Sequence, residues 1–271
     1  MMRIIPPLVL FIGIGIVIPS IYYFIFRRRA QLEIPAWVWS VIGFIAFVFF
    51  PLFLFRKHWE AAMVFKKNVF WFITFVVQMD NNFWETLAKL LVIIIFIILT
   101  RDKSKDTFKR KNCAIILGYW VGLCYGIGEA LTLTIIGFFP ILNRIFGINL
   151  FMYFTTWEAV WERAYAIQVH AIIGALVGIG LYHWFGLRKR WWLLFFFFIG
   201  MLYHELVDGS VLVMMYFPKF AFVKFIGNNV LTITLPFLII IGYLILFIAY
   251  RTSKNVIISQ EIRLENVKEI I

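Results

Sequence analysis

The segment from Trp157 to Trp184, WEAVWERAYAIQVHAIIGALVGIGLYHW, is long and apolar enough to cross a membrane as one helix. It nevertheless carries polar and charged side chains at Glu158, Glu162, Arg163, Gln168 and His170. An ionised side chain in hydrocarbon costs several kcal/mol, so such groups should face the interior of a helix bundle and find partners there. On a helix, Arg163, His170 and Gly174 fall on one stripe, and Gly174 with Gly178 forms a G-x-x-x-G pair that lets another helix come close. The segment therefore predicts a polar site with a tightly packed helix pair beside it.

The composition places the whole chain in a membrane. Of its 271 residues 63% are hydrophobic and 20% aromatic, and the mean hydropathy is +0.91, whereas soluble domains are about 45–50% apolar. Long continuous apolar runs, in place of short alternating ones, indicate spanning helices and not an outer-membrane barrel. We expect an all-α, polytopic transmembrane helix bundle, a single integral membrane domain over residues 1–271 with a short cytoplasmic tail at 251–271.

Runs of about 20 apolar residues predict seven spans, near 4–26, 37–55, 68–100, 112–139, 155–186, 191–217 and 225–250. The third run is longer than one untilted crossing and shorter than two. Asp80, Asn81 and Asn82 divide it, and they are helix-capping residue types. This pattern predicts a shorter helix or re-entrant piece up to Met79, followed by a main span from Asn82.

The net charge of +12 comes from short basic clusters between the apolar runs, an arrangement typical of topology-setting loops and not of nucleic-acid binding. In a seven-span model, one side receives 16 Lys and Arg residues and the other receives 8. The positive-inside rule then places the C terminus in the cytoplasm and the N terminus outside. We expect a multi-pass protein of the plasma (cytoplasmic) membrane, in contact with lipid. Cys113 and Cys124, the only two cysteines, are expected to be packing residues.

Two further spans carry carboxylates. Glu85 and Lys89 are four residues apart and can meet as an ion pair on one helix face. Gly118, Gly122 and Gly126 predict a smooth groove for close helix contact, and Glu129 continues that groove. Glycine packing does not explain a carboxylate within an apolar span, which is by default a candidate for a functional site.

Imidazoles occupy the two later spans. His170 follows Arg163, which can stay charged by pairing with Glu129, Glu162 or Glu158. His204 and Asp208 lie one turn apart, so Asp208 can orient the imidazole or both can face one reacting centre. By contrast, the remaining polar residues near basic loops are predicted to lie at the surface, namely His58, Glu60 and His183.

The order of these clusters resembles an intramembrane protease superfamily of the glutamic type, which includes the CAAX-processing prenyl endopeptidases and the PrsW and YhfC types. The resemblance covers about residues 80–210, over Glu85-x-x-x-Lys89, the glycine-rich span ending in Glu129, Glu162-Arg163 followed by His170, and His204-x-x-x-Asp208. The pair Glu162-Arg163 before His170 is most similar to the YhfC type, and Lys89 with G-x-x-E at Glu129 to the PrsW type. The family has adjacent glutamates where this chain has Glu85 followed by Thr86.

The resemblance implies hydrolysis of a peptide bond in a membrane-associated peptide or protein. Glu85 would activate water as the base and share it with Glu129, since a desolvated carboxylate can serve as a general base near neutral pH. His170 and His204 would stabilise the oxyanion or protonate the leaving amine, with Asp208 orienting His204. Lys89, Arg163 and Glu162 would support the site as charge partners, and no cofactor is required.

Other interpretations use the same residues. His170 and His204 with Glu129 or Asp208 could bind Zn²⁺, although no H-E-x-x-H motif is present. Intramembrane acids and histidines also form proton relays in transporters, and the glycine faces alone could serve a non-catalytic membrane scaffold. The peptidase interpretation predicts that Glu85, Glu129, His170 and His204 converge, whereas a transporter would string them along a path open to both sides.

Overall fold

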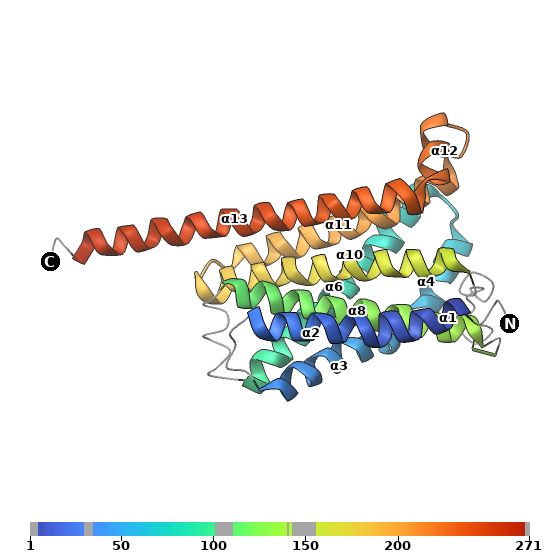
Figure 1. Cartoon of the computed structure of the whole chain (residues 1–271). Helices are drawn as coiled ribbons and strands as arrows, with labels where there is room; N and C mark the ends of the chain where they lie inside the picture. The colour runs from blue at the N-terminus through green and yellow to red at the C-terminus, as the bar shows by residue number, and fades with distance from the viewer. Residues whose placement is uncertain (1–4, 30–34, 101–110, 140, 143–155, 269–271) are drawn as a thin grey trace.

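The computed structural model describes residues 5–29, 35–100, 111–139, 141–142 and 156–268, and these form helices joined by short connections (Figure 1). The described helices are α1 Ile5–Val9, η1 Leu10–Val17, α2 Ile18–Arg29, α3 Ala36–Phe53, α4 Phe55–Lys66, α5 Phe70–Phe72, η2 Ile73–Gln78, α6 Met79–Thr100, α8 Lys111–Phe138, α10 Trp157–Leu181, η4 Tyr182–Gly186, α11 Trp191–Tyr216, α12 Ala221–Asn228, η5 Val230–Thr234 and α13 Leu235–Lys268. Most of the predicted basic cluster at 101–111, and Arg144, lie outside the described residues.

Five of the described helical stretches are long and apolar enough to cross a membrane. They are Phe70–Thr100, Lys111–Phe138, Trp157–Gly186, Trp191–Tyr216 and Val230–Thr252. A shorter apolar helix occupies Ala36–Leu52. The prediction of an all-helical fold is thereby confirmed for the described residues, and these five helices are candidates for membrane spans.

The stretch from Phe70 to Thr100 is one continuous helix, with a π-helical stretch at η2. The predicted break at Asp80–Asn82 is therefore wrong. These side chains do not cap a helix end. They form hydrogen bonds and an ion pair with residues of neighbouring helices and of the next turn of their own helix. Asp80 forms an ion pair with Arg56 of α4, and Asn82 donates to Glu205 of α11 over 2.8 Å.

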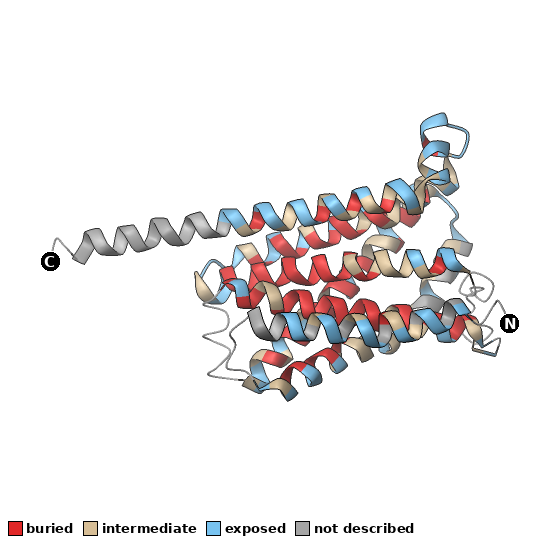
Figure 2. Cartoon of the chain, viewed as in Figure 1, coloured by how far each residue is buried: buried red, intermediate tan, exposed pale blue. Residues whose placement is uncertain are grey.

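Helices α8 and α10 form the centre of the bundle, where burial is most complete (Figure 2). Their glycines pack backbone to backbone. A Cβ atom on Gly118 would lie 2.1 Å from the Gly174 carbonyl oxygen, and one on Gly178 would lie 2.2 Å from that of Ala114. Only glycine allows so close an approach, so each predicted glycine stripe packs closely on another helix as expected, and the structure shows that the two stripes pack on each other.

The outer helices pack on this central pair through further close contacts. A Cβ on Gly128 of α8 would lie 2.1 Å from the Phe47 carbonyl oxygen of α3. Helix α13 is held to the centre by Tyr243, whose hydroxyl donates to Gln168 of α10 over 2.6 Å and pairs with the Tyr119 hydroxyl of α8 at 2.8 Å. The side-chain carbonyl of Gln168 thus accepts hydrogen bonds from two tyrosines of neighbouring helices. Cys113 and Cys124 are buried and unbridged, as predicted.

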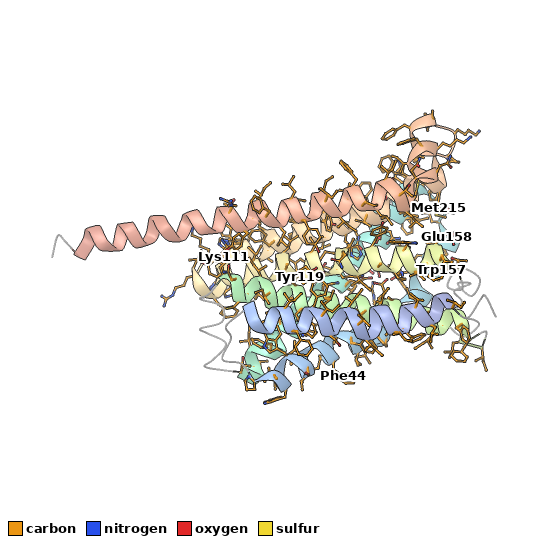
Figure 3. All side chains as sticks on the ribbon, viewed as in Figure 1. Phe44, Lys111, Tyr119, Trp157, Glu158 and Met215 are labelled. Atoms are coloured by element: carbon orange, nitrogen blue, oxygen red, sulfur yellow. The ribbon has the colours of Figure 1, made fainter. Side chains whose placement is uncertain are left out.

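One end of the bundle carries the short helix α12, which projects from it (Figure 1). Trp157, Glu158 and Met215 lie toward this end and Lys111 toward the opposite one (Figure 3). Helix α12 exposes large apolar side chains, with Phe222 73% exposed. Such an amphipathic helix is suited to lie at a membrane interface. At the other end, helix α13 continues beyond the bundle to Lys268.

Candidate functional site

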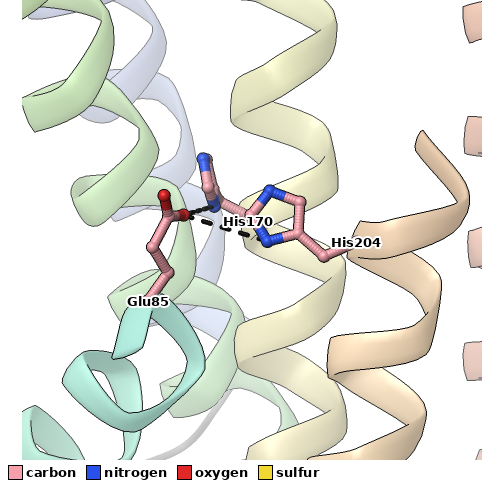
Figure 4. A group of neighbouring side chains, drawn as sticks. All are labelled: Glu85, His170 and His204. Carbon is pink, nitrogen blue, oxygen red and sulfur yellow. Dashed lines mark ion pairs between the residues drawn. The ribbon is translucent and has the colours of Figure 1, made fainter. Parts of the chain in front are cut away.

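Three side chains from three helices meet in the bundle interior: Glu85 of α6, His170 of α10 and His204 of α11 (Figure 4). The Glu85 Oε2 atom lies 3.7 Å from His170 Nδ1 and 3.9 Å from His204 Nδ1. The two imidazole rings stand edge to face with their centroids 5.1 Å apart. All three side chains are buried, so their polar atoms face one another in place of solvent.

The outer nitrogen of each imidazole faces a second carboxylate. His170 Nε2 is hydrogen-bonded to Glu129 of α8, and His204 Nε2 lies 3.6 Å from Asp208 Oδ2 on its own helix. The second distance is within ion-pair range but longer than a hydrogen bond. Four helices therefore contribute to one cluster, and all five predicted catalytic residues belong to it.

Arg163 lies on the far side of Glu129 from His170. Its guanidinium donates to Glu129 Oε1 over 3.0 Å and also pairs with Glu162. Two of the three predicted partners are thus present. Arg163 and Glu129 are mostly buried, with side-chain exposures of 12% and 14%, so the ion pair compensates charges that neither residue could carry alone at this depth.

Lys89 is placed differently from the prediction. Its ammonium donates to the backbone carbonyl of Glu85 over 2.9 Å, and it lies 3.9 Å from the ring centroid of Tyr125. The expected side-chain ion pair with Glu85 is therefore not formed. The fully buried lysine is stabilised by a carbonyl and an aromatic face, which leaves the Glu85 carboxylate directed toward the imidazoles.

Several polar residues of the cluster were not predicted. Asn81 donates to Glu85 Oε1 over 3.0 Å, and Asn82 donates to Glu205. Tyr125 places its ring edge-on to His170 with centroids 5.3 Å apart. The spacing of four residues between Asn81 and Glu85, and between Tyr125 and Glu129, is the sequence signal that would have found two of them.

A further polar group lies beside the site on α4 and α6. Arg56 pairs with Asp80 and lies over the Trp84 ring at 5.2 Å. Burial lowers the pKa of the Arg56 guanidinium, and the negative charges of Glu60 and Glu85 oppose that shift.

The predicted surface histidine at position 183 is buried. Its ring stacks on Trp192 with centroids 4.9 Å apart and on Phe196 at 5.7 Å. The prediction was wrong because the aromatic residues after the basic turn fold back over the imidazole. Glu60 is also partly buried, and the side chain of His58 lies outside the described part of the structure.

Three buried atoms at the centre of the cluster have no hydrogen-bond partner among the described residues: Glu85 Oε2, His170 Nδ1 and His204 Nδ1. One ligand atom from each of these residues lies within 4.8 Å of the others. Such a group can hold a water molecule or a metal ion. The predicted alternative joined His170 and His204 with Glu129 or Asp208 in a zinc site, whereas the third residue whose ligand atom lies near both imidazoles in the structure is Glu85.

No protein-family model matches the chain, and neither a curated protein nor a solved structure matches it. The resemblance to intramembrane proteases consequently depends on the motif residues alone. The fold and the cluster define a broader class, an all-helical membrane protein with a carboxylate and imidazole centre buried among its helices.

Proposed function

We propose that this chain is an intramembrane peptidase that hydrolyses a peptide bond of a membrane-associated substrate. The observation that supports the proposal is one connected cluster from four helices, in which Glu85 faces His170 and His204 and Glu129 bonds to the outer nitrogen of His170. Buried ionisable groups in a membrane protein are rare and mark functional sites. Here they are also the groups that general acid–base catalysis requires.

In the proposed reaction Glu85 accepts a proton from a water molecule as that water attacks the carbonyl carbon of the substrate. The imidazoles of His170 and His204, on the other side of the water, stabilise the developing oxyanion or protonate the leaving amine. Glu129 and Asp208 orient the two rings through their outer nitrogens. Arg163 pairs with Glu129 on the side away from His170.

The polar cluster extends from helix to helix and not along the length of the bundle. This arrangement favours a hydrolytic centre over a proton-coupled transporter, which needs polar groups along a path through the membrane. Toward the end of the bundle opposite α12, the fully buried residues of α6 beyond Lys89 are the apolar Val92, Ile93 and Phe96. On α8 and α10 the same region is occupied by the glycine contacts. Within the described residues, α6, α8 and α10 carry no further acidic or imidazole group toward that end, and the next imidazole, His183, follows α10 on η4 and stacks on aromatic rings.

Substrate access is proposed from the α12 end. A pocket of about 720 Å³ opens there between α8, α10, α11, α12 and η5, and Glu162, Arg163, Met214 and Leu231 are among its lining residues. Arg163 connects this pocket to Glu129 and thus to the cluster. An apolar peptide segment with a polar end would fit this pocket, because its lining combines aliphatic side chains with Glu162 and Arg163.

For the topology we propose seven crossings of the plasma membrane, with the N terminus outside and the C terminus in the cytoplasm. The two crossings beyond the five long helices would be the helical run Ile5–Arg29 and α3. The excess of Lys and Arg on one side supports this orientation. In this proposed orientation, α12 and the pocket lie at the outer face of the membrane.

The proposal is tested by reconstituting the purified chain in liposomes with a library of single-span peptides and identifying products by mass spectrometry. The wild-type chain should cut, and Glu85→Gln should reduce the rate by at least about 100-fold, the usual contribution of a general base. His183→Phe is a matched control, because a phenyl ring can keep the stacking on Trp192 and Phe196. Cutting by Glu85→Gln at the wild-type rate would refute the proposal.

A further inference from the structure

We infer that Glu85, His170 and His204 form a binding site for a divalent transition-metal ion. The inference concerns ion binding and stands apart from the proposed peptidase activity. Only the choice of zinc as the ion rests on the proposed function, since iron(II) also accepts two histidines and one carboxylate.

The donor set and its spacing fit a metal ion. Two imidazoles and one glutamate leave a fourth position open, which is the ligand set of a class of catalytic zinc sites. With metal–ligand bonds of about 2.0–2.2 Å, neighbouring ligands of a tetrahedral ion are about 3.4 Å apart. The distances of 3.7 and 3.9 Å from Glu85 Oε2 to the two Nδ1 atoms exceed this by about half an ångström or less.

The orientation of both rings fits as well. A histidine that binds a metal commonly gives its other ring N–H to a carboxylate, which fixes the tautomer and turns the free lone pair toward the ion. His170 has this arrangement with Glu129, and His204 faces Asp208 in the same way at a longer distance. In this arrangement Glu129 and Asp208 are positioning residues behind the ligands.

The tautomers of the two rings decide whether a metal ion or a water molecule can satisfy the three central atoms. If each Nε2 carries the proton toward its carboxylate, each Nδ1 offers a lone pair, and the Glu85 carboxylate offers another. Three acceptors then face one point, and none has a donor among the described residues. A single water has two protons and can satisfy only two of them, whereas a cation satisfies all three.

A zinc ion at this point would lower the pKa of its bound water to about 7. Glu85 would then serve hydrolysis as a ligand of the ion, and the ion in its place would make the bound water nucleophilic. Glu129 and Asp208 would hold the two imidazoles in position behind the ion.

The test measures the metal content of the chain, purified in detergent without a polyhistidine tag and without added metal, by mass spectrometry. We expect about one zinc ion per wild-type chain, and less than a tenth of that in Glu85→Gln, His170→Ala and His204→Ala. The apoprotein titrated with Co²⁺ should show the visible absorption of a four-coordinate site. Glu129→Gln should weaken Co²⁺ binding by about 10–100-fold, as the loss of a positioning carboxylate does.

Two controls keep the result interpretable. His183→Phe removes a buried histidine elsewhere and Glu158→Gln removes an exposed glutamate of α10, and both should retain the full metal content. Monodispersity and thermal unfolding of every variant identify any that fails to fold. Zinc should also raise the Tm of the wild-type apoprotein and leave that of His204→Ala unchanged.

A folded wild-type chain that lacks metal and fails to bind Co²⁺ or Zn²⁺ at micromolar concentration would overturn the inference. So would metal that persists in all three ligand variants. The outcomes remain separate from those of the peptidase proposal. Metal binding without peptide cleavage would refute only the peptidase, and peptide cleavage by a chain that binds neither Zn²⁺ nor Co²⁺ would refute only the metal site.

Discussion

The substitution Gly122→Ala tests the close packing of α8 on α10 at the backbone of His170, a residue of the site. A Cβ atom at this position would lie 2.1 Å from the carbonyl oxygen of His170. Ordinary contact begins near 3.4 Å, so the two helices must separate by more than about 1 Å. The obstacle is backbone, which has no rotamer to change, and overpacking of this kind destabilises by about 1–3 kcal/mol. Alanine regains about 1 kcal/mol of helix propensity, leaving a net loss of about 2 kcal/mol at the upper end of that range.

The assay is thermal unfolding in detergent, followed by tryptophan fluorescence. We expect Gly122→Ala to lower the Tm by several degrees and to reduce cleavage, because His170 is displaced relative to Glu129. The matched control is Gly13→Ala, where an added Cβ meets no described atom within 4 Å, so its Tm should equal or exceed that of the wild type. A Gly122→Ala chain that melts within one degree of the wild type would show that the helices are not in backbone contact.

Three further predictions concern charge, hydrogen bonding and topology. Arg163→Met should destabilise the chain by about 3 kcal/mol, because it leaves the buried Glu129 without its cation; Arg163→Lys should lose less, and equal losses would contradict a charge-based role. Tyr125→Phe should leave the free energy of unfolding unchanged or raise it by about 1 kcal/mol, since the buried hydroxyl has no hydrogen-bond partner among the described residues; a clear loss of stability would reveal a partner. Single cysteines at the exposed Lys189 and Phe222 should react with membrane-impermeant reagents from the cytoplasmic and outer sides respectively, against the background of two buried native cysteines, and labelling of both from one side would refute the proposed topology.

The central helix pair could be predicted because glycine leaves a distinct signal. Gly118 and Gly174 meet as the four-residue spacing indicated, and Glu129 lies at the end of the groove beside His170. Helical periodicity places a side chain on a face, and the cost of charge in lipid directs that face inward. These two arguments suffice to predict that polar groups from four helices meet inside the bundle.

The same reasoning failed where a side chain had a choice of partners. Asp80, Asn81 and Asn82 are capping residue types by composition, but α4, α6 and α11 supply their partners, and the helix continues through them. Lys89 has the spacing for an ion pair with Glu85 and instead bonds to that residue's carbonyl group, because the Tyr125 face lies beside it. Such choices depend on distances between helices, which the sequence of one helix does not contain.

The central claim, that these groups form a single reaction centre, is tested most directly by the cleavage rates of Glu85→Gln, His204→Ala and the double variant. Residues that act as one unit are strongly non-additive, so removing the second after the first has little further effect. We predict that the double variant cuts at the rate of the slower single variant. If the two losses multiply instead, Glu85 and His204 act independently and the account of a shared centre is contradicted.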